Sequence, residues 1–247
     1  MFAFSEQRGR VAVAFTDRVG GVSEPPYDSL NLAALGHDDR SAVAENLGRV
    51  MEAFAGSANA SAALMHQVHG ADVAVVDSDP GPAVAGVDGV PKVDGLVTAL
   101  PEVTLVVRVA DCVPVLLADL ERGVVAALHA GRPGLVAGIV PAGVDVLRGL
   151  GADELVAWVG PHVCGRCYEV PEQMRADVAD VVPEAWAETS WGTPAVDVGA
   201  GVVAQLRAVG AEVVDASRCT REEPDLYSFR RDGARAGRMA GLVRVRG

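Results

Sequence analysis

Residues 108–131 read Arg-Val-Ala-Asp-Cys-Val-Pro-Val-Leu-Leu-Ala-Asp-Leu-Glu-Arg-Gly-Val-Val-Ala-Ala-Leu-His-Ala-Gly, and this stretch decides the fold. Two short apolar runs, Val113–Ala118 and Gly123–Leu128, flank the polar loop Asp119–Arg122. Short valine-rich runs around a polar loop of four residues predict a β-hairpin. An antiparallel pair of strands is therefore expected in the middle of the chain.

The hairpin brings a cysteine and a histidine together. If Ala118 pairs with Gly123, the antiparallel register places Cys112 directly opposite His129. Opposed Cβ atoms lie about 4.5–5.5 Å apart, close enough for a thiolate and an imidazole to share one metal ion or one proton. A slip of one residue would turn the side chains to the other face, and a buried core cysteine beside a strand-end histidine fits the same stretch. Both residues stand where apolar strands end, which favours a functional site.

Composition restricts the class of protein. The chain has 247 residues, half of them hydrophobic, with no internal repeat or long linker, so we expect one domain over residues 1–247. A net charge of −12 opposes binding to nucleic acid or an anionic membrane, although a few local arginines can still bind a small anion. No apolar run approaches the length of a membrane span, and no signal-peptide pattern opens the sequence. We expect a cytoplasmic protein, and both a monomer and a small homo-oligomer are compatible with the sequence.

Hydrophobic periodicity predicts further elements on both sides of the hairpin. The expected strands cover residues 11–15, 73–76, 93–98, 103–110, 155–159, 212–215 and 242–245. The expected helices cover residues 42–55, 135–150, 171–182 and 198–209, and the segments 25–35 and 77–91 are expected to be loops.

Several polar positions beside these elements are candidates for ligand contacts. The Gly-Gly pair at residues 20–21 lets the backbone approach a ligand, with Arg18 at the rim, or forms a plain turn. Arg132 stands near the start of a helix, where exposed N–H groups favour anions. His66 and His69 point to opposite faces if their segment is extended, whereas both can reach one site if it is helical.

Four cysteines occur, at positions 112, 164, 167 and 219. In a cytosolic protein, cysteines bind metals or act in catalysis more often than they form disulfides. Cys164 and Cys167 form a C-x-x-C pair, but no second C-x-x-C pair follows that would complete a structural zinc site. We expect a tight structural turn there, with a redox pair as the weaker alternative.

Seven short motifs follow one another along the chain. They are Phe15-Thr-Asp-Arg-Val-Gly-Gly-Val-Ser23, His66-Gln-Val-His-Gly70, Asp94-Gly-Leu-Val-Thr98, Ala110-Asp-Cys-Val-Pro-Val115, His129-Ala-Gly131, Gly160-Pro161 with Cys167-Tyr-Glu-Val170, and Cys219-Thr220 with Phe229-Arg-Arg-Asp-Gly233. Their order and spacing resemble the YfiH-type family, whose members are known as polyphenol oxidases or laccase-domain proteins and as purine nucleoside phosphorylases. The resemblance covers nearly the whole chain.

The resemblance implies an α/β fold of the α+β type, in which mixed β-sheets are sandwiched between helices. It also implies a metal site at His69, Cys112 and His129, with zinc as the expected ion and copper as the alternative. The residues expected at the substrate are Arg18, Asp111 and Arg132.

This sequence departs from the family pattern at two places. The common His-Ala-Gly-Trp-Arg-Gly reads His129-Ala-Gly-Arg-Pro-Gly134, so the aromatic residue is lost and the arginine stands one position earlier. The common Gly-Pro-x-Ile-Gly-x-Cys-Cys-Tyr-Glu reads Gly160-Pro-His-Val-Cys-Gly-Arg-Cys-Tyr-Glu169. The resemblance therefore does not fix substrate contacts near Arg132 and His162, whereas all three metal-ligating positions match.

The implied activity is zinc-dependent phosphorolysis of adenosine, inosine or methylthioadenosine, with adenosine deamination as a side activity. One cysteine and two histidines leave a coordination position of zinc open, as in catalytic sites. Zinc lowers the pKa of bound water towards about 7, and such a water is a nucleophile for deamination. Phosphorolysis needs a cationic site for phosphate, for which Arg18 and Arg132 are the candidates.

Other functions compete with this one. The resemblance also implies peptidoglycan editing, the hydrolysis of a wrong amino acid from a UDP-muropeptide precursor, for which the same zinc or Cys-His chemistry would serve. In a metal-free hydrolase Cys112 would be the nucleophile and His129 the base. A structural zinc site would need a fourth ligand such as His66. A copper polyphenol oxidase fits poorly, because multicopper oxidation needs several coppers and more histidines than the five present.

Overall fold

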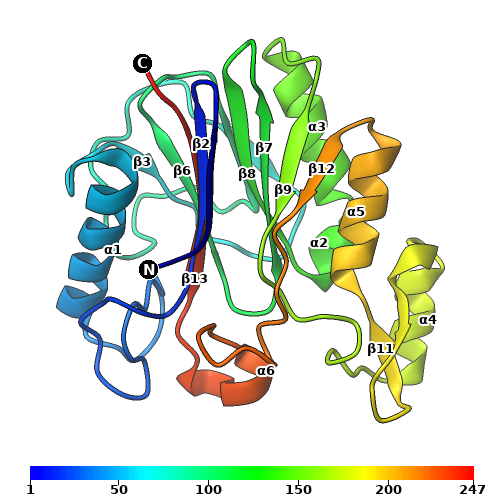
Figure 1. The fold of residues 1–247 in the computed structure, drawn as a ribbon. Helices are drawn as coiled ribbons and strands as arrows, with labels where there is room; N and C mark the ends of the chain where they lie inside the picture. The colour runs from blue at the N-terminus through cyan, green and yellow to red at the C-terminus, as the bar shows by residue number, and fades with distance from the viewer.

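The chain folds into layers, with two β-sheets packed face to face between helices (Figure 1). The computed structural model describes all residues from Met1 to Gly247. The strands of the first sheet lie in the order β1 (Phe2–Arg8), β2 (Val11–Thr16), β13 (Met239–Val245), β6 (Thr104–Val109) and β3 (Ala62–Ala63). Those of the second sheet lie in the order β12 (Glu212–Asp215), β9 (Val156–Val159), β7 (Val113–Asp119), β8 (Val124–Ala130), β5 (Gly95–Thr98) and β4 (Val73–Val75).

Helices cover both outer faces of this pair of sheets. They are α1 (Arg40–Ala55), α2 (Arg132–Ala137), α3 (Ile139–Gly149), α4 (Glu172–Ala179), α5 (Val198–Ala208) and α6 (Phe229–Asp232), with short 3-10 turns at Pro183–Ala185 and Gly233–Arg235. Helix α1 packs on the first sheet, and α2, α3 and α5 pack on the second. A small hairpin of β10 (Trp186–Glu188) and β11 (Pro194–Val196) stands beside α4.

The central core lies between the two sheets. Phe15 and Leu105 of the first sheet belong to one buried cluster with Leu116 and Trp158 of the second. Because β7 and β8 are covered on both faces, every residue of both strands is buried, and their sequences are apolar without alternation. These layers confirm the expected class of mixed sheets sandwiched between helices.

The central hairpin forms as predicted, but its predicted register is wrong by two residues. Strand β7 continues to Asp119, so His129 lies opposite Pro114 instead of Cys112. The Asp119 carboxylate accepts hydrogen bonds from two backbone N–H groups of the turn, and Gly123, with a φ of 68°, belongs to that turn. A shift of two residues keeps every side chain on its face. Cys112 and His129 therefore still lie at the same end of the hairpin.

The predicted helix over residues 135–150 is wrong as one continuous element. Gly138, with a φ of 83°, ends α2 and begins α3. Pro141 has no N–H to donate to the carbonyl of Ala137, so an unbroken helix would lose that hydrogen bond. The first of the two helices begins at Arg132, directly after the strand that carries His129.

The other predicted strands and helices form, with ends that differ by three residues or fewer. The segment 25–35 is not a surface loop throughout, because Leu30 and Leu32 are buried in the core beneath α1. Strand β1, which is only partly buried, and the three-residue strands β10 and β11 are not predicted from the sequence. None of the helices is both long and apolar enough to span a membrane.

Candidate functional site

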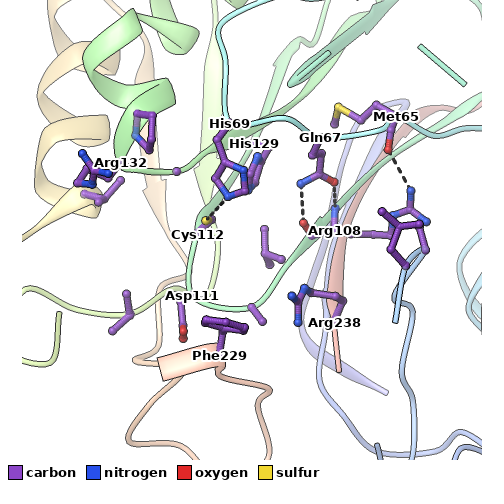
Figure 2. A pocket seen from close by; sticks show the side chains of 18 of the residues that line it. Met65, Gln67, His69, Arg108, Asp111, Cys112, His129, Arg132, Phe229 and Arg238 are labelled. Carbon is purple, nitrogen blue, oxygen red and sulfur yellow. Dashed lines mark hydrogen bonds between the residues drawn. The ribbon is translucent and has the colours of Figure 1, made fainter. Parts of the chain in front are cut away.

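The three side chains predicted as metal ligands meet at one end of the central hairpin (Figure 2). Cys112 directly precedes β7, His129 lies in β8, and His69 comes from the loop between β3 and β4. The Cys112 Sγ and His69 Nε2 atoms are 3.8 Å apart, and one ligand atom from each residue lies within 4.8 Å of the others. His66 lines the same pocket as these three side chains but is not part of this group. The three side chains are close enough to bind one ion together.

Asp94 holds both histidines in place. Its Oδ1 atom lies 2.7 Å from His129 Nδ1, which directs the Nε2 atom of that ring away from Asp94. The same carboxylate accepts hydrogen bonds from the backbone N–H groups of His69 at 2.9 Å and Gly70 at 2.7 Å. Burial raises the pKa of Asp94, but the hydrogen bonds from His129 and the backbone outweigh burial and lower it. Asp94 is therefore an ionised carboxylate that orients the site.

Cys112 and His129 stabilise each other's charged forms. Burial opposes the Cys112 thiolate, but the positive charge of His129 outweighs burial and lowers the pKa of Cys112 to about 6. Burial likewise opposes the His129 imidazolium, but the Cys112 thiolate and the Asp94 carboxylate raise the pKa of His129 to about 9. Near neutral pH the chain without metal holds a thiolate beside an imidazolium. The thiolate is the form of cysteine that binds metals and acts as a nucleophile.

Gly131 leaves the space that this group needs. A Cβ atom at this position would lie 2.7 Å from His69 Cδ2 and 3.3 Å from Cys112 Sγ. Any larger residue would push these two side chains apart. Steric contact with His69 and Cys112 therefore explains why the third residue of the His-Ala-Gly motif is a glycine.

His69, Cys112 and His129 line one pocket, which has a volume of about 700 Å³. Arg132, which the sequence analysis places at the substrate, lines this pocket, as does Asp111. Tyr168 and Phe229 contribute aromatic rings to its wall. A ligand in the pocket can therefore reach the Cys-His-His group, two flat rings and several cationic side chains at once.

Arg108 and Arg238 line the same pocket without an anionic partner (Figure 2). The Arg108 guanidinium donates to the carbonyl of Met65 at 3.0 Å, and Arg238 donates to two carbonyls of its own loop, but neither forms an ion pair. Burial lowers the pKa of Arg108 to about 10 and also lowers the pKa of Arg238, so both stay protonated at neutral pH. Arg108 is buried and Arg238 is half-buried, and two such charges without counter-ions indicate a place for an anion.

Two predicted substrate residues have other contacts. Arg18 is outside the pocket lining, where its guanidinium donates to the carbonyl of Asp28 at 2.7 Å and stacks 4.7 Å from the Tyr227 ring. Asp111 accepts hydrogen bonds from Thr220 Oγ1 and the Arg230 N–H, both at 2.6 Å. Asp111 thus anchors the chain that forms the pocket wall. Gly21, in the turn beside Arg18, packs closely against the backbone of Ser29 and Leu30.

Sequence reasoning missed four residues of the site that the structure brings together: Gln67, Asp94, Arg108 and Arg238. Gln67 exchanges two hydrogen bonds with the backbone of Arg108, at 2.7 and 2.9 Å, and so ties the His69 loop to β6. Gln67 and Asp94 lie in the motifs His66–Gly70 and Asp94–Thr98, but the residue pattern of these motifs does not indicate what either side chain does. The one available signal is Arg108 itself, a charge inside the apolar run of β6.

Asp94→Asn is expected to weaken metal binding at Cys112 about 10- to 100-fold, which is the usual cost of losing a carboxylate behind a ligating histidine. Chelator competition measures this change.

In the metal-free Asp94→Asn protein the pKa of His129 should fall, and the pKa of Cys112 should rise above about 6, because less imidazolium faces the thiolate. The pH dependence of Cys112 alkylation reports that shift. The matched control is Asp145→Asn on the outer helix α3; equal behaviour of the two variants would contradict the role of Asp94.

The comparisons with known proteins cover nearly the whole chain. A family described as multi-copper polyphenol oxidoreductase laccase matches residues 12–246. The chain is 55% identical to a protein of Streptomyces coelicolor named purine nucleoside phosphorylase, over 93% of each chain. It is similar in fold to YlmD from Geobacillus stearothermophilus, with a TM-score of 0.86 and 30% identity over 100% of both chains. It is also similar to the hypothetical protein YfiH of Bacillus licheniformis, with a TM-score of 0.86 and 27% identity over 96% of this chain and 93% of that one.

Proposed function

This chain belongs to the family of multi-copper polyphenol oxidoreductase laccases, which includes the YfiH-type proteins, and we propose that it is a zinc-dependent purine nucleoside phosphorylase. One observation carries the proposal: a Cys-His-His group shares its pocket with two arginines that have no anionic partner. The name of the Streptomyces relative supports it. The proposed substrates are adenosine, inosine and methylthioadenosine, each with inorganic phosphate.

The side chains present fit zinc at His69, Cys112 and His129. Thiolate and imidazole are the usual zinc ligands, and the hydrogen bond from His129 to Asp94 is the support that metal-bound histidines commonly have. Copper shares the preference for these ligands and is the alternative ion. When bound, zinc supplies a Lewis acid that can polarise an oxygen or nitrogen atom of the substrate.

The arginines and aromatic rings supply the rest of a phosphorolysis site. The reaction breaks the bond between ribose C1′ and the purine nitrogen, while a phosphate oxygen bonds to C1′ and the phosphate proton passes to the purine. Arg108 and Arg238 would bind the phosphate and fix its position, since guanidinium groups match phosphate oxygens in charge and geometry. Tyr168 and Phe229 would present apolar faces to the purine. The products are the free base and a sugar 1-phosphate, which is ribose 1-phosphate for adenosine and inosine and keeps the 5-methylthio group for methylthioadenosine.

Adenosine deamination is the proposed side activity of the same pocket. It replaces the C6 amino group with an oxygen atom from water and releases ammonia. It consumes no phosphate, so phosphate dependence separates the two reactions.

The test is an assay of untagged protein whose metal content has been measured. Adenosine and inosine are supplied with and without phosphate, and free base, ribose 1-phosphate and ammonia are quantified. We expect release of base that requires phosphate, ammonia from adenosine with or without phosphate, and loss of both activities after chelation with recovery on zinc addition. A protein that releases an amino acid from a UDP-muropeptide, with no nucleoside turnover, would contradict the proposal and favour peptidoglycan editing.

A further inference from the structure

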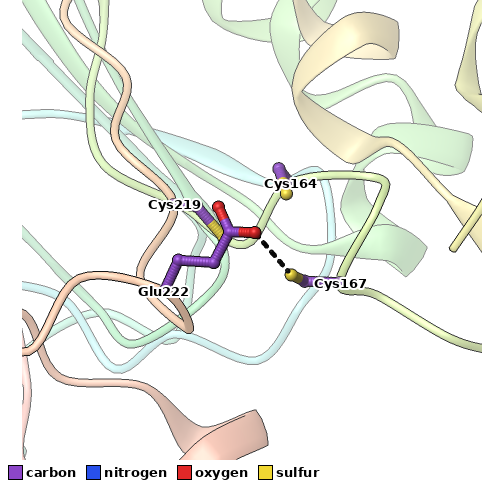
Figure 3. Close-up of side chains that lie close together, drawn as sticks. All are labelled: Cys164, Cys167, Cys219 and Glu222. Atoms are coloured by element: carbon purple, nitrogen blue, oxygen red, sulfur yellow. Dashed lines mark hydrogen bonds between the residues drawn. The ribbon is translucent and has the colours of Figure 1, made fainter. Parts of the chain in front are cut away.

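A second group of metal-binding side chains lies outside the pocket lining (Figure 3). It consists of Cys164, Cys167, Cys219 and Glu222, and one ligand atom from each lies within 4.8 Å of the others. All three cysteines are free thiols in the structure. Three sulfur atoms and a carboxylate converge here from two segments of the chain, and the phosphorolysis site uses none of them.

The sheet topology explains why two distant segments meet. Strands β9 and β12 are parallel neighbours, and Val159 pairs with Asp215 at their carboxyl ends. The chain leaves both strands at the same edge of the sheet. A bridge between His162 and Cys219 continues the pairing beyond the strands. Residues more than fifty positions apart are thereby held side by side.

Each segment contributes two ligands from one tight turn. The Cys167 N–H donates to the carbonyl of Cys164 at 2.9 Å, which confirms the turn predicted at the C-x-x-C pair. The Glu222 N–H donates to the carbonyl of Cys219 at 3.2 Å, so Cys219-x-x-Glu222 forms a second turn with the same spacing. The sequence contains no second C-x-x-C pair. In the structure, the turn Cys219-x-x-Glu222 takes the place that such a pair would have.

We propose that Cys164, Cys167, Cys219 and Glu222 bind a second zinc ion with a structural role. Three thiolates and one carboxylate complete the four ligands of a tetrahedral zinc site, which leaves no position open for a substrate. The Cys167 Sγ atom is already 3.5 Å from Glu222 Oε1, so a small closure would bring all four ligands to one ion. The only cation paired with this carboxylate is Arg166, whose guanidinium lies 3.8 Å from it at the exposed rim.

The ion would fasten two loops that form one wall of the pocket. The Val163 N–H, next to Cys164, donates to the carbonyl of Asp111 at 3.0 Å, and Thr220 Oγ1, next to Cys219, donates to the Asp111 carboxylate. Asp111 directly precedes the pocket cysteine. A second zinc would thus position the pocket wall without contact with the substrate.

Metal analysis of untagged protein tests this proposal without any activity assay. The wild type should bind two zinc ions per chain, whereas Cys112→Ser and Cys219→Ser should each bind one. With cobalt in place of zinc, the thiolate-to-cobalt absorption per ion should be about threefold stronger in Cys112→Ser, which keeps three thiolates, than in Cys219→Ser, which keeps one. A wild type that binds a single ion, lost in Cys112→Ser, would overturn the proposal.

Glu222→Gln provides a test that does not depend on a cysteine, because the residue is exposed and its loss should not unfold the chain. This variant should lose the second ion to a chelator at a concentration at least tenfold lower than the wild type. Glu223→Gln is the matched control, since Glu223 lies in the same turn but pairs with Arg218. Equal zinc retention by the two variants, or a disulfide among the three cysteines in freshly purified protein, would contradict the site. Nucleoside turnover plays no part in these readouts, so this proposal and the phosphorylase proposal can fail separately.

Discussion

Replacement of Cys112 by serine is expected to abolish nucleoside phosphorolysis and metal binding in the pocket. Serine keeps the size of the side chain but removes the thiolate, whose pKa of about 6 makes it available as a ligand near neutral pH. The pKa of His129 should also fall, because the thiolate charge that raises it is gone. A Lewis acid contributes several kcal/mol to transition-state stabilisation. We therefore expect kcat/KM to fall by about 1,000-fold or more.

The measurement is steady-state phosphorolysis of inosine, with zinc content and circular dichroism on the same sample. His37→Ala is the control, since this exposed histidine is not part of the pocket lining or of either ligand group. Full turnover in Cys112→Ser would exclude the zinc-centred mechanism. Activity of the wild type that resists chelators and is blocked by alkylation would favour the metal-free mechanism, in which Cys112 is the nucleophile and His129 its base.

Arg238→Gln is expected to raise the KM for phosphate about 10- to 100-fold while the KM for the nucleoside changes little. The substitution removes a charge that faces the pocket without an ion-pair partner. A hydrogen bond to a charged group contributes about 1.5–3 kcal/mol, and about 1.4 kcal/mol corresponds to tenfold. Arg238 is the better target of the two pocket arginines, because Arg108 also links β6 to the His69 loop.

Phosphate titrations at saturating inosine check this prediction. Arg122→Gln, at the exposed turn of the central hairpin, is the control. Arg18→Gln tests the alternative that Arg18 binds the phosphate, as the sequence suggests. Because Arg18 lies outside the pocket lining, we expect the KM for phosphate to be unchanged in this variant. An increase in Arg18→Gln without an increase in Arg238→Gln would place the phosphate elsewhere.

The central hairpin was predictable because few residues separate its strands. A four-residue turn allows only a small set of registers, and the two-residue error left Cys112 and His129 at the same end. Cys112 and His129 therefore meet because the short turn between β7 and β8 brings the ends of these two strands together. The resemblance to a family added His69, but its position in space depends on the hydrogen bonds that the Asp94 carboxylate makes to its loop.

The pocket arginines and the second cysteine group could not be derived in this way. Arg108 lies in a strand buried on both faces, where the sequence has no alternation to show which side chains face a ligand. Cys219 joins Cys164 because β9 and β12 are neighbours in the sheet, and similar apolar strands do not encode their own order. The sequence by itself determined most of the secondary structure and the contacts closed by short turns, since these depend on neighbouring residues. The tertiary structure decided which distant charges and thiols share a pocket or a site, because strand order and layer packing arise from the whole chain.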